Sequence, residues 1–167
     1  MSSAVLPDVK IRTSGEYVQL LREINNEIAQ AIDACGTEQL WQLTVAEGWT
    51  VAATANHAAG VQQFVADLFN AFLDGRTSPA VSAEDIDGNN ARQAARTADA
   101  GRDDTLAHLD LASAALIAAI EGFPADQFGQ QVSDVAGFSM TAEQLLEFAI
   151  IGHLQEHLAS IRATIAS

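Results

Sequence analysis

The sequence predicts an all-α protein, built as an up-down-type four-helix bundle. Apolar residues recur every three or four positions in four long segments, as on the buried face of an amphipathic helix. No segment shows the sustained alternation of apolar and polar residues that is typical of a strand. With 167 residues, 49% of them hydrophobic, the chain can enclose one core, so we expect a single domain over residues 1–167.

The first helix is predicted from Ser14 to Cys35. Thr13 and Glu16 have the spacing of a capping box, in which each side chain binds the other residue's backbone N–H. Cys35 is the only cysteine, which excludes an intramolecular disulfide, and we expect it to be a buried core thiol. The residues that share the apolar face are Tyr17, Leu20, Leu21, Ile24, Ile28, Ala31, Ile32 and Cys35.

The second helix is predicted from Val51 to Leu73, with Thr50 as its N-cap. Its apolar face holds Val61, Phe64, Val65, Leu68 and Phe72. Residues 76–90 contain proline, glycine and many small polar residues, which indicate a loop. A short helical piece over residues 91–98 follows this loop.

The third long helix is predicted from an N-cap at Asp103 to about Glu121. The last helix is predicted to begin at the capping box of Thr141 and Gln144 and to continue to the C-terminus. Residues 132–135 are too few to indicate a strand, so we expect no sheet.

Two histidines lie one turn apart on the last helix, where its pattern requires core residues. His153 and His157 fall on the stripe that also contains Leu146, Ile150 and Ile161. Their Cβ atoms are expected about 5–6 Å apart, so both rings can reach one metal ion at ~2.0–2.1 Å. His57 falls on the apolar face of the second helix and is the best candidate for a third ligand. We expect the remaining histidine, His108, to be a solvated surface residue.

Chance and core packing are the competing explanations for these histidines. Gly60 and Gly152 flank these histidines. A glycine inside a helix costs about 1 kcal/mol relative to alanine. We therefore expect each glycine to allow close packing of helices or access to the site. We expect Glu156, at the edge of the stripe, to be a solvated glutamate, and a partner for a ligand imidazole is the alternative. Residues 153–157 also match the HxxEH motif of inverted zinc proteases, but those enzymes are larger and contain sheets.

The net charge of −14, with only eight basic residues, argues against nucleic acid and anionic membranes as partners. No stretch is typical of a signal peptide or a membrane span, so we expect a cytoplasmic protein. Apolar residues on outer helix faces favour a homodimer. Acidity otherwise indicates a solvated surface.

The order of the helices and histidine motifs along this sequence resembles that of the DinB-like superfamily, also called DinB/YfiT-like metalloenzymes. The resemblance lies in Gly48-Trp49-Thr50 before the helix of His57, followed much later by an HxxxH helix. It implies a four-helix bundle that binds zinc, nickel or iron through His57, His153 and His157. Characterised relatives include S-transferases and isomerases that use bacillithiol, mycothiol or glutathione. In the maleylpyruvate isomerase branch, a Glu typically stands where this sequence has His153.

These observations predict a metal-dependent enzyme of the low-molecular-weight-thiol S-transferase type, or an isomerase, acting on a small-molecule substrate. A divalent ion held by three neutral imidazoles keeps an open position and lowers the pKa of a thiol bound there. The alternative is a non-catalytic bundle that binds a small molecule or a partner chain, with a structural or vestigial metal site. Water access at the ion would distinguish the two classes.

Overall fold

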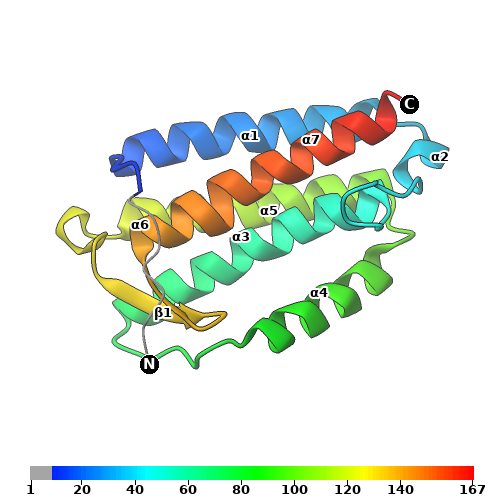
Figure 1. The fold of residues 1–167 in the computed structure, drawn as a ribbon. Coiled ribbons are helices and arrows are strands. Elements are labelled where there is room, and N and C mark those ends of the chain that lie inside the picture. The colour runs from blue at the N-terminus through cyan, green and yellow to red at the C-terminus, as the bar shows by residue number, and fades with distance from the viewer. Residues whose placement is uncertain (1–8) are drawn as a thin grey trace.

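The computed structural model describes residues 9–167. The expectation about a signal peptide concerns the N-terminus, and residues 1–8 lie outside the described range. The bundle consists of α1 (Ser14–Ala34), α3 (Val51–Leu73), α5 (Arg102–Gly122) and a last helix ending in α7 (His153–Ile165). Each of α1 and α3 packs against both α5 and α7 (Figure 1). The predicted all-α four-helix bundle is confirmed. Among the described helices, α5 alone has the length and hydropathy to span a bilayer, and it lies in the bundle against α1 and α3.

The predicted helix starts are largely confirmed. Thr13 and Glu16 form the capping box of α1, and Thr50 caps α3 by accepting the backbone N–H of Ala53 at 3.1 Å. Cys35 is 1% exposed, as expected for a core thiol. The start of α5 is corrected: Gly101, and not Asp103, is its N-cap. A four-residue helix, α2 (Thr37–Leu40), follows α1 directly.

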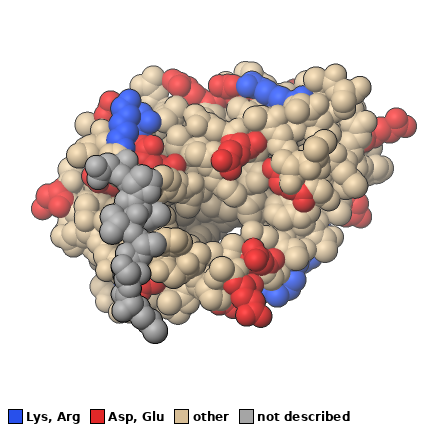
Figure 2. All heavy atoms as spheres, in the orientation of Figure 1, with Lys and Arg blue, Asp and Glu red and all other residues tan. Residues whose placement is uncertain are grey.

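The predicted loop over residues 76–90 is confirmed only to residue 82, because α4 (Ala83–Thr97) begins within it and includes most of the short helix predicted over residues 91–98. Ser82 and Asp85 form its capping box, but of its own residues only Ala94 is buried, so the segment lacks the apolar period that reveals a helix. Because α4 leads the chain back along the bundle, α3 and α5 run in the same direction (Figure 1). Figure 2 shows the face in this view hollowed between α4 and the bundle.

The expectation of no sheet is also wrong. Strands β1 (Gln131–Val135) and β2 (Phe138–Thr141) form an antiparallel hairpin that follows a short turn, η1 (Ala125–Gln127). Ala136 and Gly137 join the strands with φ of 53° and 83°, the signs that a two-residue hairpin turn requires. Val132 and Met140 turn inward and complete the core, which explains how such short strands are held.

The last helix is continuous but not regular. Thr141 and Gln144 form the predicted capping box of α6 (Ala142–Gln144), and a π-helical segment, η2 (Leu145–Gly152), leads into α7. A Cβ at Gly152 would lie 3.3 Å from the carbonyl oxygen of Glu147, which is closer than an ordinary contact. Close packing therefore favours glycine at this position, as expected. Such π segments inside α-helices are frequent at functional sites.

A buried pair of carboxamides joins α1 to α3. Asn25 and Gln62 exchange two hydrogen bonds of 2.9 Å and are 7% and 0% exposed. Each amide therefore satisfies the other inside an otherwise apolar contact.

We predict that Gln62→Ala lowers the free energy of unfolding by about 1–3 kcal/mol, because Asn25 would be buried without its partner. Denaturant titration measures this change. Gln63→Ala is the matched control, because Gln63 is exposed and bonds only Asp67 one turn along; it should change stability by less than about 0.5 kcal/mol. Equal effects of the two variants would contradict the prediction.

Candidate metal centre

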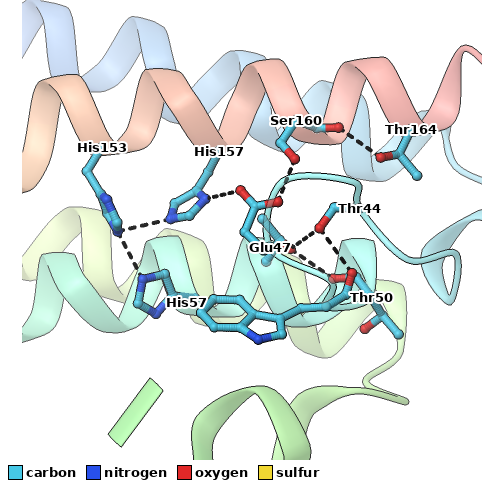
Figure 3. A network of polar contacts seen from close by, with 10 residues as sticks. Thr44, Glu47, Thr50, His57, His153, His157, Ser160 and Thr164 are labelled. Atoms are coloured by element: carbon cyan, nitrogen blue, oxygen red, sulfur yellow. Dashed lines mark hydrogen bonds and ion pairs between the residues drawn. The ribbon is translucent and has the colours of Figure 1, made fainter. Parts of the chain in front are cut away.

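Three histidines from two facing helices meet at one point in the bundle. His57 projects from α3, and His153 and His157 project from α7 (Figure 3). The Nε2 atom of His153 lies 2.9 Å from the Nε2 atoms of both His57 and His157. His57 and His157 are 3% and 5% exposed, whereas His153 is half-buried. The structure thus brings together the three histidines that the sequence singled out as ligands.

The loop before α3 adds a carboxylate to the cluster. Glu47 accepts a hydrogen bond from His157 Nδ1 at 2.8 Å through one oxygen and from the Ser160 hydroxyl at 2.5 Å through the other (Figure 3). A tight turn holds the loop, because Gly48 has φ of 69° and donates its N–H to the Thr44 carbonyl at 2.9 Å. A left-handed backbone at this point favours glycine.

The next residues of the loop enclose His57. The Trp49 ring packs edge-on against the His57 ring with centroids 5.1 Å apart. Thr50 then begins α3 and donates its hydroxyl to the Ala98 carbonyl at 2.8 Å, which ties this corner to the segment after α4. The Gly48-Trp49-Thr50 sequence therefore positions the carboxylate, the indole and the start of the helix together.

Burial controls the protonation of the cluster. It lowers the pKa of His57 to about 4 and that of His153 to about 3, and the proximity of the His157 ring adds to both effects. Burial raises the pKa of Glu47, but hydrogen bonds from Ser160, Thr44 and His157 outweigh it, so this pKa lies below its ordinary value. At neutral pH, His57 and His153 are uncharged bases beside an ionised carboxylate.

The hydrogen-bond pattern of the three rings suits a cation. A carboxylate can only accept, so His157 donates from Nδ1 to Glu47 and keeps a lone pair on Nε2. One proton on His153 Nε2 cannot serve the Nε2 atoms of both neighbours with normal geometry, whereas a single cation can accept all three lone pairs. The residues present therefore fit a divalent transition metal.

Glu156 is exposed, as a solvated glutamate would be, and the carboxylate that bonds a histidine of the cluster is Glu47. Glu47 lies in a loop, so no periodic pattern marks it in the sequence. His108 is not a solvated surface residue: it is half-buried, and its Nδ1 lies 2.8 Å from Asn56 Oδ1. Burial accordingly lowers the pKa of His108.

Metal sites in four-helix bundles are built from side chains that project inward from facing helices, as these imidazoles do. The sequence profile of the DinB superfamily matches residues 20–161. The chain therefore belongs to the DinB superfamily, and the family predicted from the sequence is confirmed. The comparison with curated proteins found no match.

Solved structures share the fold at low sequence identity. YfiT from Bacillus subtilis, described as a probable metal-dependent hydrolase with an unusual four-helix bundle topology, is 21% identical with a TM-score of 0.77, over 96% of this chain and 91% of that one. A colibactin self-resistance protein, ClbS, solved in complex with double-stranded DNA, is 12% identical with a TM-score of 0.72, over 96% and 97%.

A mycothiol-dependent maleylpyruvate isomerase is similar over only part of its length. It is 17% identical with a TM-score of 0.73, over 90% of this chain and 63% of that one. The chain thus spans less than two thirds of this relative. At these identities the likeness to all three structures shows the fold alone.

We predict that the metal-free protein loses stability as pH falls from about 6.5 toward 4. His57 stays neutral when folded until its pKa of about 4, while in the unfolded chain it binds a proton below about 6.5. This one histidine lowers the free energy of unfolding by up to about 1.4 kcal/mol per pH unit in that window. The pKa of His153 is also lowered, so this histidine likewise lowers the free energy of unfolding as pH falls.

Denaturant titrations in a chelating buffer measure how the free energy of unfolding changes with pH. The range from pH 6.5 to 5 is chosen because carboxylates do not titrate appreciably there. His57→Gln should reduce the slope, because glutamine does not ionise. A slope unchanged in this variant would contradict the prediction.

Proposed function

We propose that His57, His153 and His157 hold one divalent transition metal ion, and that the protein is a metal-dependent enzyme. We propose further that it transfers a low-molecular-weight thiol to a small electrophilic substrate. The observation that carries the proposal is the convergence of three Nε2 atoms, with His157 bonded to Glu47 on its far side. A histidine that binds a metal commonly donates its other N–H to a carboxylate in this way.

A divalent ion in this site would lower the pKa of a bound thiol or water and so supply a nucleophile at neutral pH. The chain itself sets the geometry. Glu47 fixes the ring and tautomer of His157, and Ser160 fixes Glu47. Trp49 covers one side of His57 and restricts water there.

The single cysteine supports a thiol co-substrate over a cysteine nucleophile. Cys35 is 1% exposed, its sulfur bonds the Ala31 carbonyl, and burial raises its pKa. The protein therefore offers no reactive thiolate of its own. In the proposed transfer, the incoming sulfur bonds to the electrophilic carbon, the leaving group departs with its electron pair, and the thiol proton passes to solvent.

The surface supports access by a small molecule. The hollow in Figure 2 lies beside α3 and α7, which carry the three histidines, and His153 is only half-buried. A closed structural site would bury all its ligands. The partly open position favours the catalytic proposal over the non-catalytic bundle.

The finer properties stay predictions. Imidazole ligands suit zinc, nickel and iron alike, so the site does not select among them. The net charge of −14 disfavours nucleic acid as a partner, although the ClbS structure contains DNA. A cytoplasmic location and a homodimer likewise rest on the sequence.

The first experiment measures metal by elemental analysis of untagged protein. We expect about one transition metal ion per chain in the wild type and its loss in His153→Ala, because two imidazoles alone hold the ion poorly. His108→Ala is the matched control and should keep the metal, since His108 bonds Asn56 outside the cluster. Wild-type protein that stays metal-free after incubation with zinc, nickel or iron would overturn the proposal.

The second step measures thiol consumption by metal-loaded protein, with glutathione, mycothiol and bacillithiol against a panel of electrophiles. We expect turnover that falls to background in His153→Ala. Metal-loaded protein that consumes no thiol, or that forms only products of water addition, would overturn the transferase assignment. Metal binding would still stand in that case.

We also predict that Glu47→Gln weakens metal binding by about 10- to 100-fold, because an amide oxygen supports the His157 N–H less strongly than a carboxylate. Competition with a chromogenic chelator measures the affinity. Glu156→Gln is the matched control: it removes a carboxylate of the same α7 that is exposed to solvent, and it should bind as the wild type. Equal losses in both variants would show that general charge, and not the Glu47 contact, supports the metal.

A further inference from the structure

One buried nitrogen of the histidine cluster has no hydrogen-bond partner among the described residues. His57 is 3% exposed, and its Nδ1 forms no hydrogen bond of normal geometry with any described residue. Nδ1 of His157, in contrast, is bonded to Glu47. A buried polar atom without a partner is unusual and costs about 1–3 kcal/mol.

The nearest suitable group comes from α4, the helix outside the bundle. The Gln93 carboxamide donates from Nε2 to the backbone carbonyl of Asn56 at 2.8 Å, the residue immediately before His57. This bond holds the carboxamide against α3 with its oxygen free to accept. Burial lowers the pKa of His57, and the Gln93 side chain opposes this effect in part.

Gly60 makes room for this carboxamide. A Cβ at position 60 would lie 2.5 Å from Gln93 Nε2 and 3.0 Å from Gln93 Oε1, both closer than normal contact. Any side chain at this position would therefore displace the carboxamide from α3. The predicted packing reason for this glycine is thus the approach of Gln93.

The tautomer of His57 decides what Gln93 does. If Nε2 of His57 faces the other two imidazoles with a lone pair, the single proton of the neutral ring must be on Nδ1. That proton needs an acceptor, and the Gln93 carboxamide is held at the neighbouring residue of α3, Asn56, with its oxygen free.

We propose that Gln93 is a positioning residue of the metal site: its Oε1 accepts the Nδ1–H of His57, and Gly60 provides the space. The carboxamide then spans two consecutive residues of α3, bonding the Asn56 carbonyl and the His57 ring. It does for His57 what Glu47 does for His157. This inference rests on the proposed metal site, but it also makes a claim about the metal-free protein.

Three variants test it. Gln93→Met keeps the length of the side chain and removes the acceptor. Gly60→Ala keeps Gln93 and displaces its carboxamide, and Gln93→Glu restores an acceptor. Gly88→Ala, also in α4 but where a Cβ would meet only Arg92, controls for a glycine-to-alanine change.

The first readout is metal affinity. We expect Gln93→Met and Gly60→Ala to bind metal about tenfold more weakly than the wild type, as is usual when the partner of a ligand histidine is lost. Gln93→Glu should recover most of that affinity, and Gly88→Ala should be unchanged. Because alanine favours a helix, Gly60→Ala should not lower the Tm of the metal-free protein, so its weaker binding is not a folding defect.

The second readout is the tautomer of His57 in metal-free protein, from long-range proton–nitrogen correlation spectra. We expect the proton on Nδ1 in the wild type and a mixture of tautomers in Gln93→Met. A wild-type ring protonated on Nε2, or Gln93→Met with unchanged tautomer and metal affinity, would overturn the inference. This measurement needs no metal, so it judges Gln93 separately from the proposed function.

Discussion

The burial of uncharged imidazoles at one point between α3 and α7 is the constraint on which the surrounding structure depends. Removing these rings from water lowers the pKa of His57 and His153 far below the neutral range. Their nitrogens then remain available as lone pairs at physiological pH, which is the state that a metal requires. The same burial makes every unpaired nitrogen costly, so each ring needs a neighbour that fixes its proton.

Those neighbours come from outside the four bundle helices. The first part of α3 is buried nearly all round, and small residues at 52, 53, 55, 58 and 59 let its neighbours approach closely. The surrounding helix surfaces therefore have little space for a polar partner beside the cluster. The loop before α3 supplies Glu47 from one side, and α4 brings Gln93 to the other. Segments that contribute little to the apolar core thus carry the polar contacts around the site.

This division explains how much the sequence could predict. The three histidines and the bundle helices follow the helical period because their side chains enter a core, and the capping residues Thr13, Thr50 and Thr141 follow from local chemistry. Glu47 could not be found in this way, because a loop residue has no periodicity to reveal its direction. The first half of α4 was missed for a related reason: the one buried residue of this helix, Ala94, lies in its second half, and only the Ser82 cap marks the start. The η2 segment was missed because an apolar pattern does not distinguish a π turn from an α turn.

The weak anchoring of α4 connects the fold to the site. Its described contacts with α3 include one buried alanine, the Gln93 bond to Asn56 and, just beyond its end, the Ala98 bond to Thr50. A helix with so little buried apolar surface opens more readily than the bundle helices, whose cores must separate before they move. Because Gln93 and the hollow lie on the same side of α3, outward movement of α4 would widen the approach to the histidines and withdraw the carboxamide from α3 together (Figures 1 and 2). If Gln93 supports His57 as proposed, outward movement of α4 would remove that support, whereas the contact of Glu47 with His157 does not involve α4.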